Sequence, residues 1–211
     1  VTFNHNRDSA VIPGINASIP GEIFPGTIEC GGVSFKTGDI WGEGNNALLC
    51  AGQQLNVSGK KFYFVGASLY GDKTYNFKVD GKLYPVKVQA INERIGKWDL
   101  YDLAEVANIK TDKLAWECTH THGTHGDNAA AQLFFFMYEV PVGESGVITL
   151  PDDSGLIIIA ATQTQEDTTT NLYTALYDRV EGREFTYKMT SKEKRYHKKM
   201  KKKWKKTPNK S

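Results

Sequence analysis

The sequence has few cysteines and no long apolar run, and each shortage excludes a class of protein. Its 211 residues contain three cysteines, Cys30, Cys50 and Cys118, an odd and widely spaced set. That set fits neither a disulfide framework nor a zinc ribbon, so the sequence predicts buried thiols. No stretch approaches the roughly 18 consecutive apolar residues that a membrane-spanning helix requires. The longest apolar runs, 133–138 and 156–161, have the length of strands.

Two further signals are missing. Helical periodicity is weak between residues 10 and 161, and no internal repeat is found. The chain opens with VTFNHNRDSA, which lacks the basic start and apolar stretch of a signal peptide. The sequence therefore leaves the compartment open, and it argues against alternating β/α units.

The dominant signal is alternation of period two, punctuated by turn residues. Residues 74–79 alternate, Asp80-Gly81 is typical of a hairpin turn, and residues 83–90 alternate again. The other predicted strands share this length and spacing: 28–35, 48–55, 61–69, 115–120, 133–140, 146–150 and 155–162. Many short strands indicate an all-β fold, and we expect an antiparallel β-sandwich of the jelly-roll type over residues 1–177.

A basic tail follows the predicted sandwich. Residues 188–211 hold eleven lysines and Arg195 against one acid, a net charge of +11, while residues 1–187 carry −9. Tyr196, Met200 and Trp204 recur every four residues, which predicts one narrow apolar stripe on a basic helix. We therefore expect a second part, residues 178–211, that is lysine-rich and partly helical. Its charge makes an anionic polymer, nucleic acid included, a possible partner.

A cluster of histidines marks the centre of the chain, in the stretch THTHGTHGDN at residues 119–128. His120 and His122 share one face of a strand, and His125 could fold back after Gly123. This set is a candidate Zn²⁺ site, with Asp127 as a further oxygen ligand. The alternative is structural: Gly126, Asp127 and Asn128 form turns, which would place the histidines at a strand end and its loop.

Several aromatic side chains lie beside predicted loops, where they could stack on sugar rings. Trp41, Tyr70 and Trp98 are each next to acids or amides that could bond hydroxyls. The alternative for Trp41 and Trp98 is that both side chains pack at the edge of the core, and the sequence favours neither role. With His120, His122, Asp127 and Asn128, they form the predicted ligand-binding set. Loop carboxylates at Asp72, Asp99 or Asp127 could also hold Ca²⁺, although no EF-hand spacing is present.

Two stretches resemble a known family. FYFVGASLYG followed by TYNFKVDG (62–81) is similar to the central hairpin of galactose-binding-like jelly-roll domains. WECTHTHGTHGD (116–127), VITLP (147–151) and IIIAAT (157–162) resemble the non-catalytic β-sandwich region of bacterial α-mannosidase-like glycoside hydrolases. The resemblance implies a sandwich associated with carbohydrate-active enzymes, and a larger glycosidase chain as partner. It transfers no catalytic residue, because those enzymes carry catalysis in a separate domain.

Three functions remain open. The first is a non-catalytic carbohydrate-binding or accessory module that contacts a glycan or polysaccharide. The second is a jelly-roll hydrolase or lyase, built from His120, His122, Glu117 and Tyr138. Strand parity places Glu117 on the face opposite His120, which argues against that set. The third is binding of an anionic polymer through the tail. We favour the first, without catalysis by this chain alone.

Overall fold

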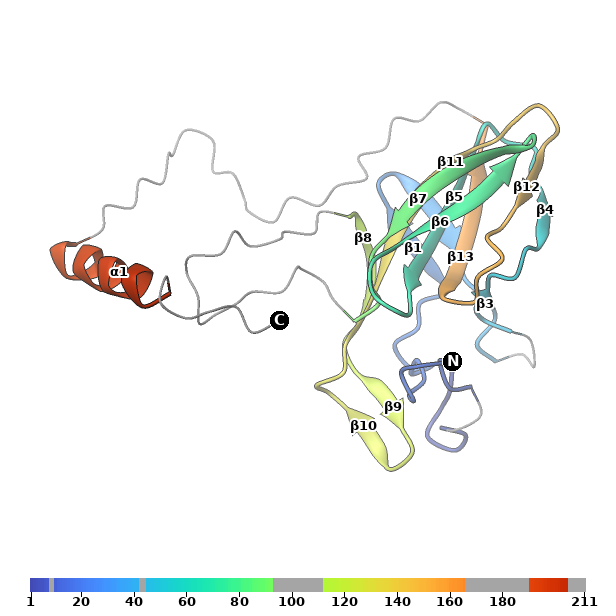
Figure 1. The fold of residues 1–211 in the computed structure, drawn as a ribbon. Coiled ribbons are helices and arrows are strands. Elements are labelled where there is room, and N and C mark those ends of the chain that lie inside the picture. The colour runs from blue at the N-terminus through green and yellow to red at the C-terminus, as the bar shows by residue number, and fades with distance from the viewer. Residues whose placement is uncertain (8–9, 42–44, 93–111, 166–189, 205–211) are drawn as a thin grey trace. The chain divides into compact units, whose positions relative to one another are not determined.

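The computed structural model describes residues 1–7, 10–41, 45–92, 112–165 and 190–204 (Figure 1). The chain divides into two compact units, Val1–Leu176 and Tyr177–Ser211. The predicted boundary between residues 177 and 178 lies outside the described residues, as do Trp98 and Asp99. It therefore stays a prediction.

The first unit is built on two antiparallel sheets (Figure 1). The larger sheet has the strand order β3-β13-β5-β11-β8, and its strands are β3 (Leu48–Leu49), β13 (Leu156–Thr164), β5 (Lys61–Ser68), β11 (Leu133–Pro141) and β8 (Leu114–Cys118). The smaller sheet has the order β4-β12-β6-β7, and its strands are β4 (Gln54–Asn56), β12 (Val147–Thr149), β6 (Lys73–Val79) and β7 (Lys82–Val88). The predicted all-β antiparallel sandwich is confirmed, whereas its jelly-roll character stays a prediction.

The core between the two sheets is rich in aromatic rings. Phe64 of β5 packs at 5.2 Å from Phe77 of β6 and at 5.3 Å from Tyr138 of β11, measured between ring centroids. Val79 and Ile148 fill the smaller sheet's side of this core. Alternation on β6 follows directly, because Tyr75, Phe77 and Val79 face the larger sheet and the residues between them face solvent.

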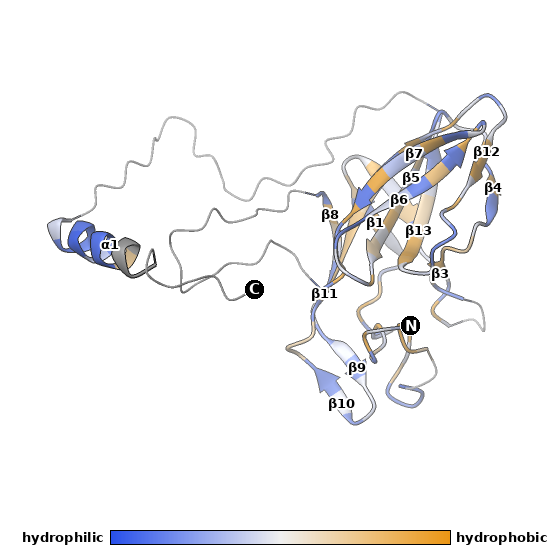
Figure 2. Cartoon of the chain, in the orientation of Figure 1, coloured by the Kyte–Doolittle hydropathy of each residue, from blue (hydrophilic) through white to orange (hydrophobic). Residues whose placement is uncertain are grey.

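The larger sheet is covered on its other face as well. There Tyr63, Val65, Phe135 and Met137 pack against a second layer. The residues of that layer come from the N-terminal segment and from the hairpin of β1 (Thr27–Cys30) and β2 (Val33–Lys36): Ile12, Ile19, Phe24, Ile28, Val33 and Phe35. A sheet buried on both faces has continuous apolar strands instead of alternating ones. This explains the runs at 133–138 and 156–161, which are coloured as hydrophobic in Figure 2.

Two predicted strands are each divided in the structure. Residues 28–35 form the β1–β2 hairpin, which turns at Gly31 and Gly32 with φ of 59° and 80°. Residues 48–55 are split between β3 in one sheet and the start of β4 in the other, with Gly52 at φ 72° between them. Glycine adopts positive φ without steric cost, so each glycine permits a change of direction that period-two reading does not detect.

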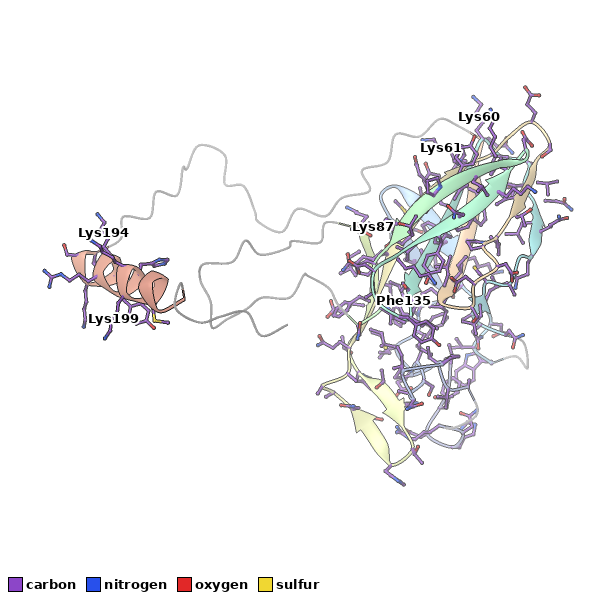
Figure 3. The ribbon with its side chains drawn as sticks, in the orientation of Figure 1. Lys60, Lys61, Lys87, Phe135, Lys194 and Lys199 are labelled. Atoms are coloured by element: carbon purple, nitrogen blue, oxygen red, sulfur yellow. The ribbon has the colours of Figure 1, made fainter. Side chains whose placement is uncertain are left out.

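The second unit contains the helix α1 (Ser191–Trp204), which confirms the predicted basic helix. Its start is a capping box: Glu193 accepts the main-chain N–H of Thr190 at 2.6 Å, and Thr190 Oγ1 accepts the N–H of Glu193 at 3.3 Å. Lys194 and Lys199 project outward from the helix in Figure 3. In the part of the chain that the structure describes, no helix is both long and apolar enough to cross a membrane.

Candidate functional site

The N-terminal segment and the loop after β2 enclose a pocket of about 470 Å³. Its floor is apolar and includes Ile12, Ile157 and Ile159. Above this floor stands Trp41, whose side chain is among the most exposed aromatic groups described, with 78% of the residue accessible. The pocket is therefore an apolar hollow with an aromatic ring at its mouth.

Trp41 is held in place by aromatic stacking. Its ring lies 4.7 Å from that of Phe3 at an interplanar angle of 16°, and Phe3 stacks in turn on His5 at 6.0 Å and 4°. The Phe3 ring lies against Gly21, where any Cβ atom would collide with it. The main-chain N–H of Trp41 donates to Asp39 Oδ1 at 2.9 Å. The indole is thus packed against Phe3 although it is largely exposed.

Polar groups surround the same hollow. His5, Asn6, Asn45 and Asn46 line it together with Trp41. Amides both donate and accept hydrogen bonds, as does a neutral imidazole. An apolar floor with a few converging polar groups is the usual composition of a small-molecule site.

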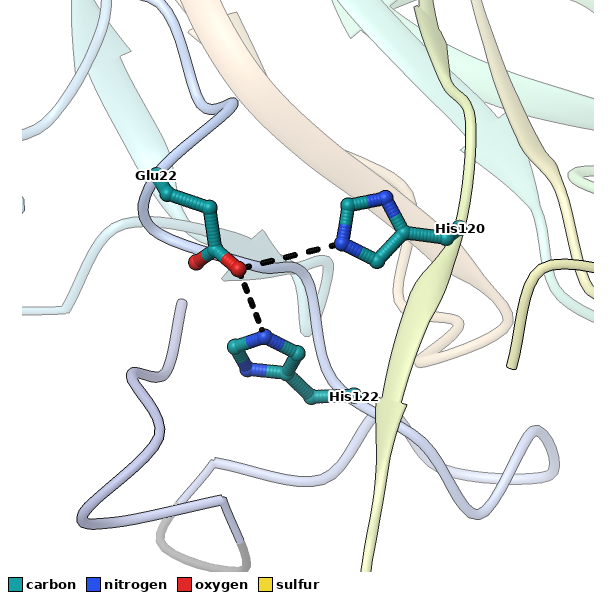
Figure 4. A group of neighbouring side chains, drawn as sticks. All are labelled: Glu22, His120 and His122. Carbon is teal, nitrogen blue, oxygen red and sulfur yellow. Dashed lines mark hydrogen bonds and ion pairs between the residues drawn. The ribbon is translucent and has the colours of Figure 1, made fainter. Parts of the chain in front are cut away.

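A second cluster lies beside the hairpin of β9 (Thr121–Gly123) and β10 (Gly126–Asn128). Glu22 Oε1 is 2.9 Å from His122 Nε2 and 3.8 Å from His120 Nε2 (Figure 4). Asp127 Oδ1 is 3.6 Å from the same His122 nitrogen. The main chain of His122 is paired in both directions with Ser18, which brings the segment carrying Glu22 to the hairpin.

The two carboxylates of this cluster favour ionisation. Burial raises the pKa of Glu22, but hydrogen bonds from its own main chain and from His122, with the charges of both histidines, outweigh burial and lower it overall. A hydrogen bond from the Arg7 guanidinium at 2.6 Å lowers the pKa of Asp127. The cluster therefore presents negative charge to two imidazoles at neutral pH.

Comparison with known families decides the class of the fold. A family described as the AziU2-like β-sandwich domain matches residues 1–167. The chain belongs to this family. No curated protein matches the sequence. The AziU2-like domain covers both sheets and both candidate sites, and it ends before α1. The galactose-binding-like and mannosidase resemblances are not established by this match, which supports the β-sandwich alone.

The AziU2-like domain brings some of the predicted site residues together and separates others. His120 and His122 converge, whereas His125 is exposed in the turn between β9 and β10. Asn128 is exposed at the end of β10, paired with Thr121. Tyr70 is also exposed and lies over Gly14 and Gly155, outside the lining of the Trp41 pocket.

The candidate calcium and catalytic sets are also dispersed. Asp72 Oδ1 accepts the N–H of Ala90 at 2.9 Å. Tyr138 lies in the inter-sheet core, where its hydroxyl donates to Asp112 at 2.7 Å. Glu117 is opposite Phe134, which faces the same core. His120 lies between the end of β8 and the start of β9, so the parity argument that set Glu117 apart from it stays a prediction.

The sequence gives no indication of three residues that complete the two sites. In the histidine cluster, Glu22 lies 100 positions from His122 and Thr2 lies 120 positions from it. In the pocket, Phe3 stacks on Trp41 across a long stretch of irregular chain. No spacing rule links them. Only the pairing of Ser18 with His122 and of Thr2 with Pro20 places them beside the cluster and the pocket.

Proposed function

We propose that this AziU2-like domain is a non-catalytic carbohydrate-binding or accessory module, and that the Trp41 pocket is its sugar site. The observation that carries this proposal is an exposed indole that is held by stacking beside an apolar hollow. An exposed aromatic face is suited to the C–H surface of a pyranose ring, which is apolar on one side. Water released from both surfaces contributes to such binding.

Specificity would come from the polar residues around the ring. Asn46 Nδ2 already donates to the carbonyl oxygen of Asp39, and Asn6 Oδ1 accepts the main-chain N–H of Phe3. The amide of Asn45 and the amide oxygen of Asn46 can bond neighbouring hydroxyls, which are donors and acceptors at once. The pocket volume of about 470 Å³ falls within the common range for small-molecule sites. This supports a short glycan, or the end of a longer one, as ligand. The association with a larger glycosidase chain rests only on the sequence resemblance.

A glycan array with untagged protein tests the proposal. We expect binding to a limited set of sugars, and loss of at least about fivefold in affinity for Trp41→Ala, because ring stacking contributes roughly 1 kcal/mol or more. Leu83→Ala is the matched control, since Leu83 is an exposed apolar residue on β7, outside the pocket. Tyr70→Ala examines the other exposed aromatic. Folded protein that binds no glycan, or that binds equally well without the indole, would contradict the proposal.

We propose a second activity, binding of an anionic polymer, for the second unit, because that unit contains the basic helix α1. Residues 191–204 hold seven lysines and Arg195 with one acid, so α1 concentrates positive charge along one helix. Such a helix favours binding to an anionic polymer by counterion release, without sequence preference. Tyr196, which is 60% exposed, adds a ring that can stack on a base. Binding to heparin and to DNA at increasing salt concentration tests this activity.

A further inference from the structure

The hydroxyl groups behind His122 form a directed chain. His122 Nδ1 lies 3.1 Å from Thr2 Oγ1, Thr2 is hydrogen-bonded to Ser18, and Ser18 Oγ lies 3.1 Å from the carbonyl oxygen of Arg7. The Thr2 and Ser18 side chains and the imidazole of His122 are fully or almost fully buried. Water is therefore a poor substitute for any of these partners.

The direction of this chain determines which nitrogen of His122 carries the proton. A carbonyl oxygen only accepts, so Ser18 donates to Arg7. Ser18 has one hydroxyl hydrogen, so the hydrogen between Ser18 and Thr2 comes from Thr2. Thr2 then has none left for His122 and accepts from its Nδ1–H. Neutral His122 therefore presents a lone pair at Nε2.

That lone pair faces another acceptor. Glu22 Oε1 is 2.9 Å from His122 Nε2, and two acceptors at this distance require either a shared proton or a metal ion between them. His120 distinguishes the two. Its Nε2 is 3.8 Å from the same Glu22 oxygen, which is too long for a hydrogen bond. A proton would satisfy His122 alone, whereas a metal ion would engage all three side chains.

The spacing of the three ligand atoms is close to that of a zinc site. With bonds of about 2.0–2.1 Å in tetrahedral geometry, neighbouring ligand atoms lie about 3.4 Å apart. The separations from Glu22 Oε1, 2.9 and 3.8 Å, bracket this value, and all three ligand atoms lie within 4.8 Å of one another. In the described ranges, Glu22, His120 and His122 are the one group with this arrangement.

The surroundings of the three ligands also suit a metal ion. The His122 side chain is fully buried, that of His120 is 21% exposed and that of Glu22 is 44% exposed, so the group opens from the interior toward solvent. Thr2 supplies the outer partner that orients a ligating imidazole. Cys118 donates its thiol hydrogen to the carbonyl oxygen of His120 at 2.8 Å, and this hydrogen bond holds the main chain at His120.

We propose that Glu22, His120 and His122 bind one divalent transition-metal ion, with Zn²⁺ as the species that this donor set favours. Nitrogen and carboxylate donors in a three-residue group leave a fourth position for water. The ion joins the N-terminal segment to the β9–β10 hairpin. This site is distinct from the sugar site, because its ligands do not line the Trp41 pocket.

The test is metal titration of untagged protein that has first been treated with a chelator. We expect calorimetry with Zn²⁺ to give one ion per chain, a rise in thermal stability, and a tetrahedral absorption spectrum with Co²⁺. Glu22→Gln and His120→Ala, which alter the two partly exposed ligands, should bind at least about tenfold more weakly while keeping the fold by circular dichroism. His125→Ala is the matched control, because that histidine is exposed in the hairpin turn, and it should bind like the natural protein.

Thr2→Val removes the hydroxyl that accepts the hydrogen bond from His122 Nδ1. We expect a loss of zinc affinity of about 10- to 100-fold, since the tautomer of His122 is no longer fixed. Folded protein that takes up no metal at millimolar concentration overturns the proposal. So does equal zinc binding by the natural protein, Glu22→Gln and His120→Ala. A His122 ring that carries both protons by ¹⁵N NMR, unchanged by added zinc, overturns it in favour of an ion pair with Glu22.

Discussion

At the scale of single residues, the three cysteines lie in surroundings that oppose loss of the thiol proton. Burial raises the pKa of Cys50 and Cys118 to about 12 and also raises that of Cys30. All three are free and buried, as the odd, widely spaced set predicted. The thiolate is the reactive form, so such thiols are inert near neutral pH.

Titration with an aromatic disulfide reagent measures how accessible the three thiols are. The native protein should show no rapidly reacting thiol at neutral pH, and all three should react once denaturant is added. Absorbance of the released chromophore gives the count and the rate. A thiol that reacts at the rate of a free peptide cysteine in the native protein would contradict the burial described here.

Asp80 joins the β6–β7 hairpin to the loop before β12. It has a positive φ of 48°, and its carboxylate accepts the main-chain N–H groups of Glu144 at 2.7 Å and Ser145 at 3.2 Å. Hydrogen bonding from Ser145, through its side chain and main chain, and from Glu144 lowers the pKa of Asp80 from 3.8. The charged form therefore stabilises the folded state.

Because the folded pKa of Asp80 is depressed, this stabilisation is present above the unfolded value of 3.8 and is lost as the pH falls through the lower folded value. Asp80→Asn tolerates the same backbone conformation but removes the charge. We expect its melting temperature to be lower than that of the natural protein at pH 7, with the difference shrinking below pH 3.8. Asp152→Asn, in the turn before β13, is the control. A difference that is constant with pH would show that charge is not the cause.

Single residues differ in how far the sequence alone locates them. Trp41 was identifiable because it stands beside turn formers in an otherwise alternating sequence. His120 and His122 were identifiable because the period of two places them on one face. Glu22 and Thr2 were not, because their position depends on pairing across 100 residues or more. Local rules carry no information about such pairing.

At the scale of elements, β5 is the centre of the larger sheet, and its Gly66 lies close to the main chain of β13. Gly66 pairs with Phe136 of β11 and with Ile158 of β13, and both of those strands have an irregular register at this level. A Cβ atom at Gly66 would lie 2.6 Å from the main-chain oxygen of Ile157. Main chain cannot yield as a flexible side chain can, so the position requires glycine.

Gly66→Ala should therefore destabilise the sandwich by about 1–3 kcal/mol, the range for inserting a group into a packed core. Urea denaturation followed by tryptophan fluorescence measures this difference. Gly26→Ala is the matched control, since a Cβ there meets no atom within 4 Å, and its unfolding midpoint should be nearly unchanged. Equal urea midpoints for Gly66→Ala and Gly26→Ala would contradict the prediction, because they would mean that β5 and β13 can move apart at Gly66 without loss of stability.

The accuracy of the element predictions follows from the environment of each strand. The strands β6 and β7 were predicted well, because one face of their sheet is solvated and alternation is visible. The strands β5, β11 and β13 were located by their apolar length instead. The predictions at 28–35 and 48–55 were wrong in extent, because a glycine with positive φ lets the chain reverse or change sheets within an apolar run.

At the scale of the whole molecule, two regions of opposite charge follow one another along the chain. Residues 1–187 carry −9 and residues 188–211 carry +11, which nearly cancel in the total of +2. The AziU2-like match ends at residue 167, and the compact units divide at 176 and 177. The sandwich also has its own two apolar cores, one on each face of the larger sheet. These observations predict that the fold does not depend on the tail.

A chain that ends at Tyr187 tests this independence. Its melting temperature should match that of the full chain within a few degrees, because both apolar cores are retained. Its retention on heparin should disappear, since the removed segment carries all of the excess positive charge. The full chain should elute earlier as salt increases, because bound counterions compete with the lysines. A large drop in melting temperature would instead mean that the acidic sandwich is stabilised by its own basic tail, and heparin would then compete with an internal contact.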